Sequence, residues 1–363
     1  MIRGTLAGYF SFIFLRWILG LFAGSLLLVM MLDLLELMRV ASESEGAGLG
    51  SLVLISALRV PALMEEVLPF LVLLGSIAAF MELSRRMELV VTRAAGLSVW
   101  QFAAPGLAVA VVIGIVGTLG YNPLATALKL KADEMAADTL GSVQNVLEQS
   151  TADAWLREAG AGAEIILHAD TLTGGGRELV APIFWRYGPD GRLAARIEAA
   201  RATLEDGAWR LEDAQVAAPN ADPVRHAEYE LPTALTPIQV RESFAAASEI
   251  SFWQLPAHLE LARAAGLPAT RFRLQFQSLL ARPLLLAAMV LIAATVSLGL
   301  ARFGNQARRI LGGIGAGFLL YVLTQLSRDI GGAGLVPPAV AAWAPAVVAA
   351  MLGVTVLLYR EDG

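Results

Sequence analysis

The chain has 363 residues, of which 56% are hydrophobic and only 16% are charged, and its mean hydropathy is +0.63. Soluble domains have about 25% charged residues, so this composition indicates a membrane protein. The net charge of −5 is spread along the chain without a basic patch, so no nucleic-acid partner is expected. The absence of cysteine excludes disulfides and thiolate metal sites.

Three apolar segments, each long enough to cross about 30 Å of hydrocarbon, come first. Residues 12–38 form a run too long for the apolar core of a signal peptide, so we expect an uncleaved span. Residues 53–80 form the second span, and residues 97–127 form a third span without any charge. The first part of the second span carries four residues unusual in a span, Arg59, Pro61, Glu65 and Glu66. We expect that part to lie in or near an interface.

A polar region, residues 129–273, follows and contains no run long enough to cross a membrane. Short segments rich in strand formers alternate there with turn residues, which predicts a sandwich or barrel-like β domain. The predicted strand segments are 163–172, 179–187, 192–206, 208–218 and 225–235. The segment 192–206 predicts either two strands or one bent strand. Residues 251–266 predict a short amphipathic helix that is closed by Gly266 and Pro268.

Three further apolar runs, residues 274–300, 310–326 and 336–359, predict three more spans. The predicted fold class is an α-helical membrane protein with six transmembrane helices in a 3+3 arrangement and an inserted all-β, jelly-roll-like domain. The predicted domains are residues 1–128, 129–270 and 271–363.

The arginines in short connections predict the orientation, since such residues are retained on the cytoplasmic side. Nine lie in one set of connections, namely Arg3, Arg16, Arg85, Arg86, Arg93, Arg302, Arg308, Arg309 and Arg360. The opposite set contains only Arg39 and Arg328. We therefore expect an inner-membrane protein with both termini in the cytoplasm and the large domain in the periplasm.

Residues 81–98, "MELSRRMELVVTRAAGLS", are charged and lie between two apolar spans, and we expect a cytoplasmic amphipathic helix over 82–95 that ends at Gly96. Its apolar face comprises Leu83, Met87, Val90, Val91 and Ala94. Its polar face comprises Glu82, Arg85, Arg86, Glu88, Thr92 and Arg93. The helix could lie on lipid or contact a cytoplasmic partner. Mixed charges and the apolar Leu89 within the polar face favour the partner.

Motifs for catalysis are missing from the sequence. No G-x-x-x-x-G-K-[ST] or G-x-S-x-G pattern occurs, and His168, His226 and His258 are far apart in sequence. We therefore expect no enzyme activity, no catalytic residue, no metal and no cofactor bound by this chain.

Two groups of residues near the spans remain to be explained. Asp33, Glu36 and Arg39 lie at the outer end of the first span, either as an interfacial cluster or as a polar lip on a cavity for an anionic amphiphile. The fifth span contains five small residues, Gly312, Gly313, Gly315, Ala316 and Gly317. They allow close helix contact, either for internal packing or for a gate that opens.

The sequence resembles the LptF/LptG permeases of the lipopolysaccharide exporter of Gram-negative bacteria over nearly its whole length. The similarity is strongest in "LPFLVLLGSIAAFMELSRRMELVVTRAAGLSVWQF", residues 68–102, and especially in "MELVVTRAAG" within it. Residues 191–216, "GRLAARIEAARATLEDGAWRLEDAQV", are similar to the family's jelly-roll domain. The ending "GAGFLLYVLTQ…PPAVAAWAPA" is more similar to LptG than to LptF.

The resemblance implies a heterodimer with the sister permease LptF on a cytoplasmic ATPase dimer, LptB, which uses ATP and magnesium. Lipopolysaccharide is expected to enter between the first span of one subunit and the fifth of the other, and to pass to the periplasmic jelly-roll proteins LptC and LptA. Residues 82–95 match the family's coupling helix, with Glu88 as its acidic contact.

The resemblance also implies a lipid-contacting role for three residues. Arg39 matches one of several basic residues that relatives carry at the outer end of the first span. Because this chain has one arginine there beside two acids, a divalent cation or the sister subunit is expected to help in headgroup recognition. Phe70 and Tyr321 match aromatic or apolar positions that face the cavity.

Two other functions fit a polytopic chain of this kind. One is an ABC subunit that transmits motion without moving lipid, although such subunits usually carry the outside domain after the first span. The other is a membrane-embedded lipid-modifying enzyme, which needs a catalytic set in one plane of the membrane, and none is apparent.

Overall fold

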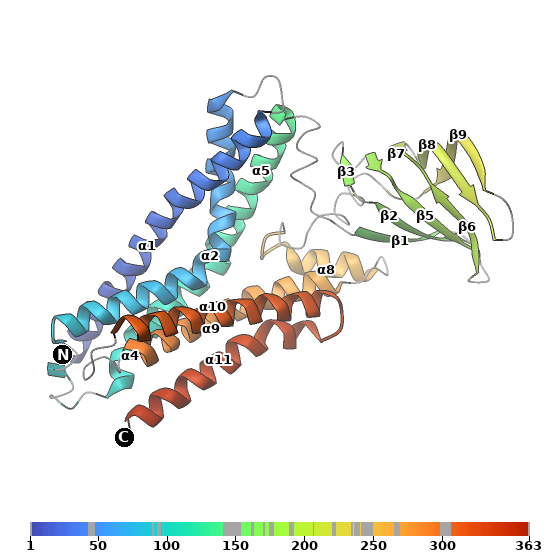
Figure 1. Cartoon of the computed structure of the whole chain (residues 1–363). Helices are drawn as coiled ribbons and strands as arrows, with labels where there is room; N and C mark the ends of the chain where they lie inside the picture. Colours follow the sequence, from blue (N-terminus) through green and yellow to red (C-terminus); the bar gives the residue numbers. More distant parts are fainter. Residues whose placement is uncertain are drawn as a thin grey trace.

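The computed structural model describes residues 2–42, 48–88, 91–92, 96, 98–140, 154–160, 163–169, 171–173, 178–188, 192–205, 207–219, 223–233, 235, 240, 250–264, 269–297 and 306–361. Within these ranges six helical segments are long and apolar enough to cross a membrane, and a β domain is inserted between the third and the fourth (Figure 1). The predicted fold class is therefore confirmed.

The spans are formed by the helices α1 (Ile2–Ala41), α2 (Leu49–Arg85), α4 (Val99–Val116) with η1 (Gly117–Tyr121) and α5 (Asn122–Leu140), α9 (Thr270–Ser297), α10 (Gln306–Gly332) and α11 (Pro338–Glu361). At about 1.5 Å per residue, α1 and α2 are each roughly twice as long as the hydrocarbon is thick. Their excess length packs against α5 in a small cluster of buried residues, Leu37, Leu52, Ile55, Ala132 and Ala136. The third span therefore continues as a helix well beyond its predicted end at residue 127.

The helix α2 changes direction along its length (Figure 1). It contains Pro61 and Pro69, and each proline removes a backbone donor from the helix, which is a common cause of a bend. The two chain termini lie at the same end of the helical part, away from the β domain (Figure 1). An even number of spans requires this arrangement.

Close contacts between helices depend on glycine at two places. A Cβ at Gly75 would lie 2.9 Å from the Cα of Ile18, so α1 and α2 touch through their backbones. A Cβ at Gly114 would lie 2.5 Å from the Cα of Pro283, so α4 packs directly on the proline of α9. Around these contacts the bundle core is aromatic, and the rings of Phe14 and Phe80 meet edge to face at 4.9 Å.

Within the described residues, the β domain is one antiparallel sheet of nine strands. They are β1 (Ala154–Gly160), β2 (Ala163–Ala169), β3 (Thr171–Thr173), β4 (Glu178–Val180), β5 (Ile183–Tyr187), β6 (Leu193–Glu198), β7 (Arg201–Glu205), β8 (Ala208–Ala217) and β9 (Val224–Pro232). Their order is β1-β2-β5-β6-β8-β7-β4-β3, and β9 pairs with the other edge of β8. The sheet thus branches at its longest strand, in keeping with the predicted jelly-roll-like domain.

The strand predictions are confirmed in outline. Residues 192–206 form two strands, β6 and β7, rather than one bent strand. The strand β1 was not among the predicted segments. Alternating burial along β7 and β8 sends Trp209 into the domain core beside Phe184, with ring centroids 6.1 Å apart. The helix α8 (Leu255–Ala264) lies within the predicted 251–266, while Gly266 and Pro268 lie outside the described residues.

One ion pair ties β8 to β9. Arg225 donates two hydrogen bonds of 2.6 Å to the carboxylate of Asp213, whose backbone φ of 52° is unusual for a residue other than glycine. The bidentate guanidinium holds the pKa of the Asp213 carboxyl below its ordinary value.

Candidate functional site

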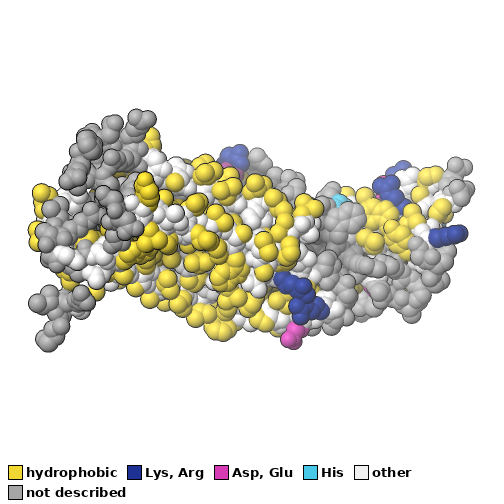
Figure 2. Space-filling model, turned by 90° about the horizontal axis from the view of Figure 1, so that it is seen from below, with side chains coloured by type: hydrophobic (Ala, Val, Ile, Leu, Met, Phe, Trp, Pro, Cys, Tyr) yellow, Lys and Arg dark blue, Asp and Glu magenta, His cyan; other side chains and the backbone are white. Residues whose placement is uncertain are grey.

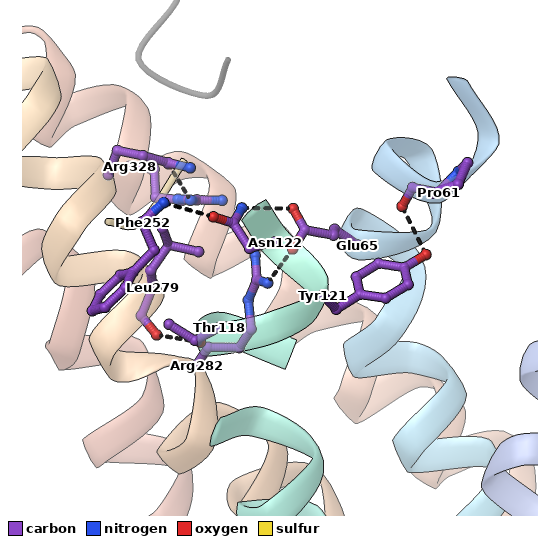
Figure 3. A network of polar contacts seen from close by, with 10 residues as sticks. Pro61, Glu65, Thr118, Tyr121, Asn122, Phe252, Leu279, Arg282 and Arg328 are labelled. Atoms are coloured by element: carbon purple, nitrogen blue, oxygen red, sulfur yellow. Dashed lines mark hydrogen bonds and ion pairs between the residues drawn. The ribbon is translucent and has the colours of Figure 1, made fainter. Parts of the chain in front are cut away.

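A network of polar side chains crosses the interior of the helical part (Figure 3). Arg282 of α9 donates to one carboxylate oxygen of Glu65 of α2 at 2.7 Å, and both side chains are only 13% exposed. The amide of Asn122, the first residue of α5, donates to the other oxygen at 3.1 Å. Three spans are therefore held together by one buried, hydrogen-bonded ion pair.

The same network reaches the segment that leaves the β domain. The backbone N–H of Phe252 donates to the side-chain oxygen of Asn122 at 2.9 Å (Figure 3), and the indole of Trp253 donates to the carbonyl of Leu119 at 3.0 Å. Leu119 belongs to η1, a π-helical turn, in which the wider spacing of backbone hydrogen bonds often marks a functional position. The exit of the inserted domain is thus fastened to the third span at a local irregularity.

A second arginine lies close to this network. Arg328 of α10 donates to the side chains of Ser278 and Gln275 on α9, at 3.3 Å and 3.1 Å. It also lines a hollow of about 440 Å³ between α9 and α10, together with Arg271, Leu274, Gln275, Asp329, Gly332 and Ala333. The predicted position of Arg328 in a connection after the fifth span is wrong, because α10 continues through this residue to Gly332.

Hydroxyl groups compensate two prolines within spans. Pro283 cannot donate to the carbonyl of Leu279, four residues earlier, and Thr118 of η1 donates to that carbonyl at 3.0 Å. Likewise Pro345 leaves the carbonyl of Ala341 free, and Ser327 of α10 donates to it at 2.8 Å. In hydrocarbon an unpaired carbonyl costs several kcal/mol, so these contacts also join neighbouring helices.

The predicted cytoplasmic helix over 82–95 is not continuous. The helix α2 ends at Arg85, and Met87 has a φ of 61°, which interrupts the helix before helical backbone resumes at Glu88 and at residues 91–92. Glu82 and Arg85 therefore belong to the second span's helix. Thr92 lies in this second helical stretch, where its hydroxyl donates to the backbone carbonyl of Glu88, one turn earlier, at 2.6 Å. Leu89 and Arg93, two residues of the predicted docking surface, lie outside the described residues.

The break is bound to α1 through six side chains, which we call the bend cluster: Tyr9, Arg16, Trp17, Glu82, Arg86 and Glu88. Glu82 receives hydrogen bonds of 2.5 Å from both Arg16 and Trp17, and it also forms an i,i+4 ion pair with Arg86 at 2.7 Å. Tyr9 donates to Glu88 at 3.0 Å. Glu82 is therefore occupied within the chain instead of facing outward.

Two of the three charged residues predicted at the outer end of α1 form an ion pair with each other. Glu36 and Arg39 pair at 2.5 Å, with both side chains exposed. Asp33 is half-buried, and its Oδ2 atom has no hydrogen-bond partner among the described residues. The exposed pair is the part of this set that is open to the surroundings.

The fifth span's glycines divide between two faces of α10. Gly313 and Gly317 are buried within the chain, where their missing side chains admit Val296 of α9 and Leu73 of α2. Of the two interpretations left open, internal packing accounts for this pair. At Gly312 and Gly315 a Cβ would meet no described atom within 4 Å, so these two lie on the open face. The structure also brings Phe70 and Tyr321 together, with ring centroids 5.2 Å apart.

Apolar side chains cover much of the helical part, as one face shows in Figure 2. The helices α1 and α10 are the least covered by the rest of the chain. In the apolar 18-residue stretch of each span, 6% is buried for α1 and 17% for α10, compared with 56% for α2. Exposed apolar area of this extent must contact lipid or another protein.

Asn122, Thr118 and Arg282 are site residues that were not predicted from the sequence. The signal available for Arg282 was an ionisable residue within an apolar run, as for Glu65, since such residues are rare and are usually paired. For Asn122 and Thr118 the sequence offered no comparable signal.

The fold and the site define a multi-pass membrane protein whose inserted β domain is fastened to an internal polar network. Residues 8–360 match the family described as the lipopolysaccharide export system permease LptF/LptG, and the chain belongs to this family. A comparison with individual curated proteins gives no match. The family assignment makes the chain a permease-type subunit of the inner membrane.

Proposed function

We propose that this chain is a permease subunit that extracts lipopolysaccharide from the inner membrane and passes it to periplasmic jelly-roll proteins of the LptC and LptA type. The family match over residues 8–360 carries this proposal. The ending of the chain favours the LptG role, with an LptF-type sister subunit as the other half of the transporter.

In this proposal the termini and the bend cluster face the cytoplasm, and the β domain faces the periplasm. The excess of arginine in one set of short connections supports that orientation. The open faces of α1 and α10 would line the shared cavity and its gates, because these two helices have the least cover within the chain.

Extraction needs an energy source, since each methylene moved out of an apolar surrounding costs about 0.8 kcal/mol. The chain has no P-loop lysine, so a separate cytoplasmic ATPase dimer would supply the work using ATP and magnesium. The segment after α2 would receive its motion, and the chain itself would perform no chemistry.

Photocrosslinking tests the lipid path directly. A photoreactive residue at Leu319 or Leu323, which are 59% and 49% exposed, should give lipopolysaccharide adducts in cells, as should one at Arg39. Leu320, on the same helix but 6% exposed, is the matched control and should give none. Adducts to protein alone at the open positions would refute a lipid path along α10.

Reconstitution separates transport from the two other functions. In proteoliposomes containing the chain, its sister subunit and the ATPase, we expect ATP-dependent release of lipopolysaccharide. Conversion of the lipid by this chain alone would support an enzyme, and release without ATP would refute ATP-driven extraction. ATP hydrolysis with no lipid released under any condition would support a transmitter of motion.

A further inference from the structure

The chain that returns from the β domain to the bundle is held by the third span just before α8. We call residues 250–254 the return segment. The backbone N–H of Phe252 donates to the side-chain Oδ1 atom of Asn122 at 2.9 Å. The next residue, Trp253, donates from its indole to the carbonyl of Leu119 at 3.0 Å. The return segment is therefore fixed to the third span by two hydrogen bonds from neighbouring residues.

The sequence of the third span explains why one of these acceptors is available. Pro123 has no backbone N–H, so it cannot donate to the carbonyl of Leu119, four residues earlier. An unpaired carbonyl within a span is costly, and the indole of Trp253 supplies the missing donor. The return segment thus completes the backbone pairing of the helix that it contacts.

The buried side chain of Asn122 connects the return segment to α2 (Figure 3). Its Oδ1 atom accepts from Phe252, and its Nδ2 atom donates to Glu65 of α2 at 3.1 Å. A backbone N–H can only donate, so the amide group has one orientation that suits both contacts, with its nitrogen toward the carboxylate. Asn122 is also the first residue of α5, the helix that precedes the β domain in the chain. The helix before the domain and the segment after it therefore meet at one residue.

We propose that Asn122 is a positioning residue, through which the β domain follows the movement of α2. Glu65 lies between Pro61 and Pro69, where α2 changes direction, so a change in this bend displaces the carboxylate that Asn122 holds. The displacement then reaches the return segment through the N–H of Phe252. This inference rests on the proposed function, because it requires α2 to move when the transporter binds ATP.

The two connections of the domain depend on α2 in different ways. The helix α5 packs on the first half of α2 through apolar side chains, among them Leu52, Ile55 and Ala132, so it follows α2 without help from Asn122. The return segment is linked to α2 through the amide of Asn122. Removal of this amide should therefore uncouple one connection of the domain and leave the other in place.

The test measures distances between spin labels by double electron–electron resonance in the complete complex of this chain, its sister permease and the ATPase dimer. The chain has no cysteine, so two introduced cysteines are the labelling sites within it. A domain pair joins Val224 of β9 to Leu335, and a bundle pair joins Leu54 of α2 to Leu335; all three residues are exposed. Both distances are measured without nucleotide and with a non-hydrolysable ATP analogue.

In the wild type we expect both distances to shift when the analogue binds. Asn122→Ala should keep the shift of the bundle pair and make that of the domain pair about twofold smaller, because one of the two connections is uncoupled. The matched control is Gln277→Ala, which also removes an amide that bonds two spans, here to Trp343 of α11, and which should behave as the wild type.

A second pair of variants tests the hydrogen bond itself and serves if Asn122→Ala does not assemble. Glu65→Gln should also reduce the shift of the domain pair, because the new amide nitrogen meets that of Asn122. Adding Asn122→Asp should restore the shift, because the new carboxylate accepts from this nitrogen and from the N–H of Phe252, and the net charge is that of the wild type.

The outcomes separate this inference from the proposed function. If the bundle pair responds to the analogue and the domain pair shifts equally in wild type and Asn122→Ala, the inference is wrong and the proposed function stands. If Gln277→Ala reduces the shift as much as Asn122→Ala, the effect is a general loosening of the bundle and the inference is also wrong. A reduced shift in Glu65→Gln that Asn122→Asp does not restore contradicts it as well. If neither pair responds in the wild type, the ATP-driven motion of the proposed function fails together with the inference.

Discussion

Removing one partner of the buried ion pair between Glu65 and Arg282 should destabilise the protein strongly. In Arg282→Met the amide of Asn122, at 3.1 Å, is the one side-chain donor that the described residues leave to the carboxylate of Glu65. The charge then remains buried without the arginine that pairs with it. Methionine has a length similar to that of the arginine stem, so loss of packing is a small part of the effect.

The magnitude follows from the burial of the pair. Two charge centres about 4 Å apart attract each other by about 4 kcal/mol at an effective dielectric constant of about 20. Breaking such a buried pair costs about 3–5 kcal/mol, and since both side chains are only 13% exposed, solvent screening reduces this little. Adding Glu65→Gln removes the orphaned charge and leaves a deficit of about 1–2 kcal/mol from lost hydrogen bonds.

Thermal melting in detergent, followed by tryptophan fluorescence, checks the order of the three proteins. Wild type should melt highest, the double variant next, and Arg282→Met lowest. The control is Arg196→Met, which breaks an ion pair with Glu198 whose partners are both 46% exposed, and which should cost less than about 1 kcal/mol. If Arg282→Met and Arg196→Met melt at the same temperature, the pair in the bundle contributes no more than a surface pair and the reasoning is refuted.

Three further predictions concern single positions. Thr118→Val should lower the free energy of unfolding by about 1–2 kcal/mol, because it leaves the carbonyl of Leu279 unpaired. The loss should be smaller in a Pro283→Ala background, where the new backbone N–H can pair with that carbonyl, and melting in detergent measures both. Gly313→Ala should lower the melting temperature because its Cβ would lie 2.8 Å from a β-branched valine, whereas Gly312→Ala on the open face should be neutral. The pKa of Asp213 is lower in the folded protein than its ordinary value of about 4. As the pH falls below about 4, the Asp213 carboxylate therefore takes up its proton more readily in the unfolded chain than in the folded protein, and the folded protein loses stability. Asp213→Asn should reduce this acid dependence, as melting curves at a series of pH values would show.

Each of these predictions has a result that would contradict it. Equal losses from Thr118→Val with and without the proline would mean that the hydroxyl does not serve the freed carbonyl. Equal melting of the two glycine variants would mean that the helices separate at little cost. An unchanged acid profile for Asp213→Asn would show that the pair with Arg225 has no net effect on folding.

The spans were predictable because hydrocarbon thickness and backbone pairing leave few solutions for long apolar runs. Their ends were not, because Lys129, Lys131 and Arg328 continue helices where charge suggested a loop. Helix geometry extends beyond the membrane, whereas hydropathy reports only the part in lipid. The missed strand β1 has the same cause, since charged residues within Ala154–Gly160 hide its alternation.

The site was harder to predict than the fold. The helix break at Met87 has no glycine or proline to announce it, so the helical spacing of residues 82–95 suggested one continuous element. The partners of Glu65 lie 57 and 217 residues away along the chain, and only tertiary packing brings them together. Sequence identified Glu65 as an unusual residue within a span, but not its partners.

The π-helical turn at Gly117–Tyr121 has an evolutionary consequence. Such a turn arises when one residue is inserted into an α-helix, and the bulge absorbs it without rotating either flank. A relative that lacks one residue at this point would have a straight third span with both halves in phase. It would also have lost the widened turn that offers Leu119 to Trp253. In such relatives we expect other residues at the position of Trp253, because its indole would have lost its acceptor. The deletion and the loss of this tryptophan should therefore occur together among homologues.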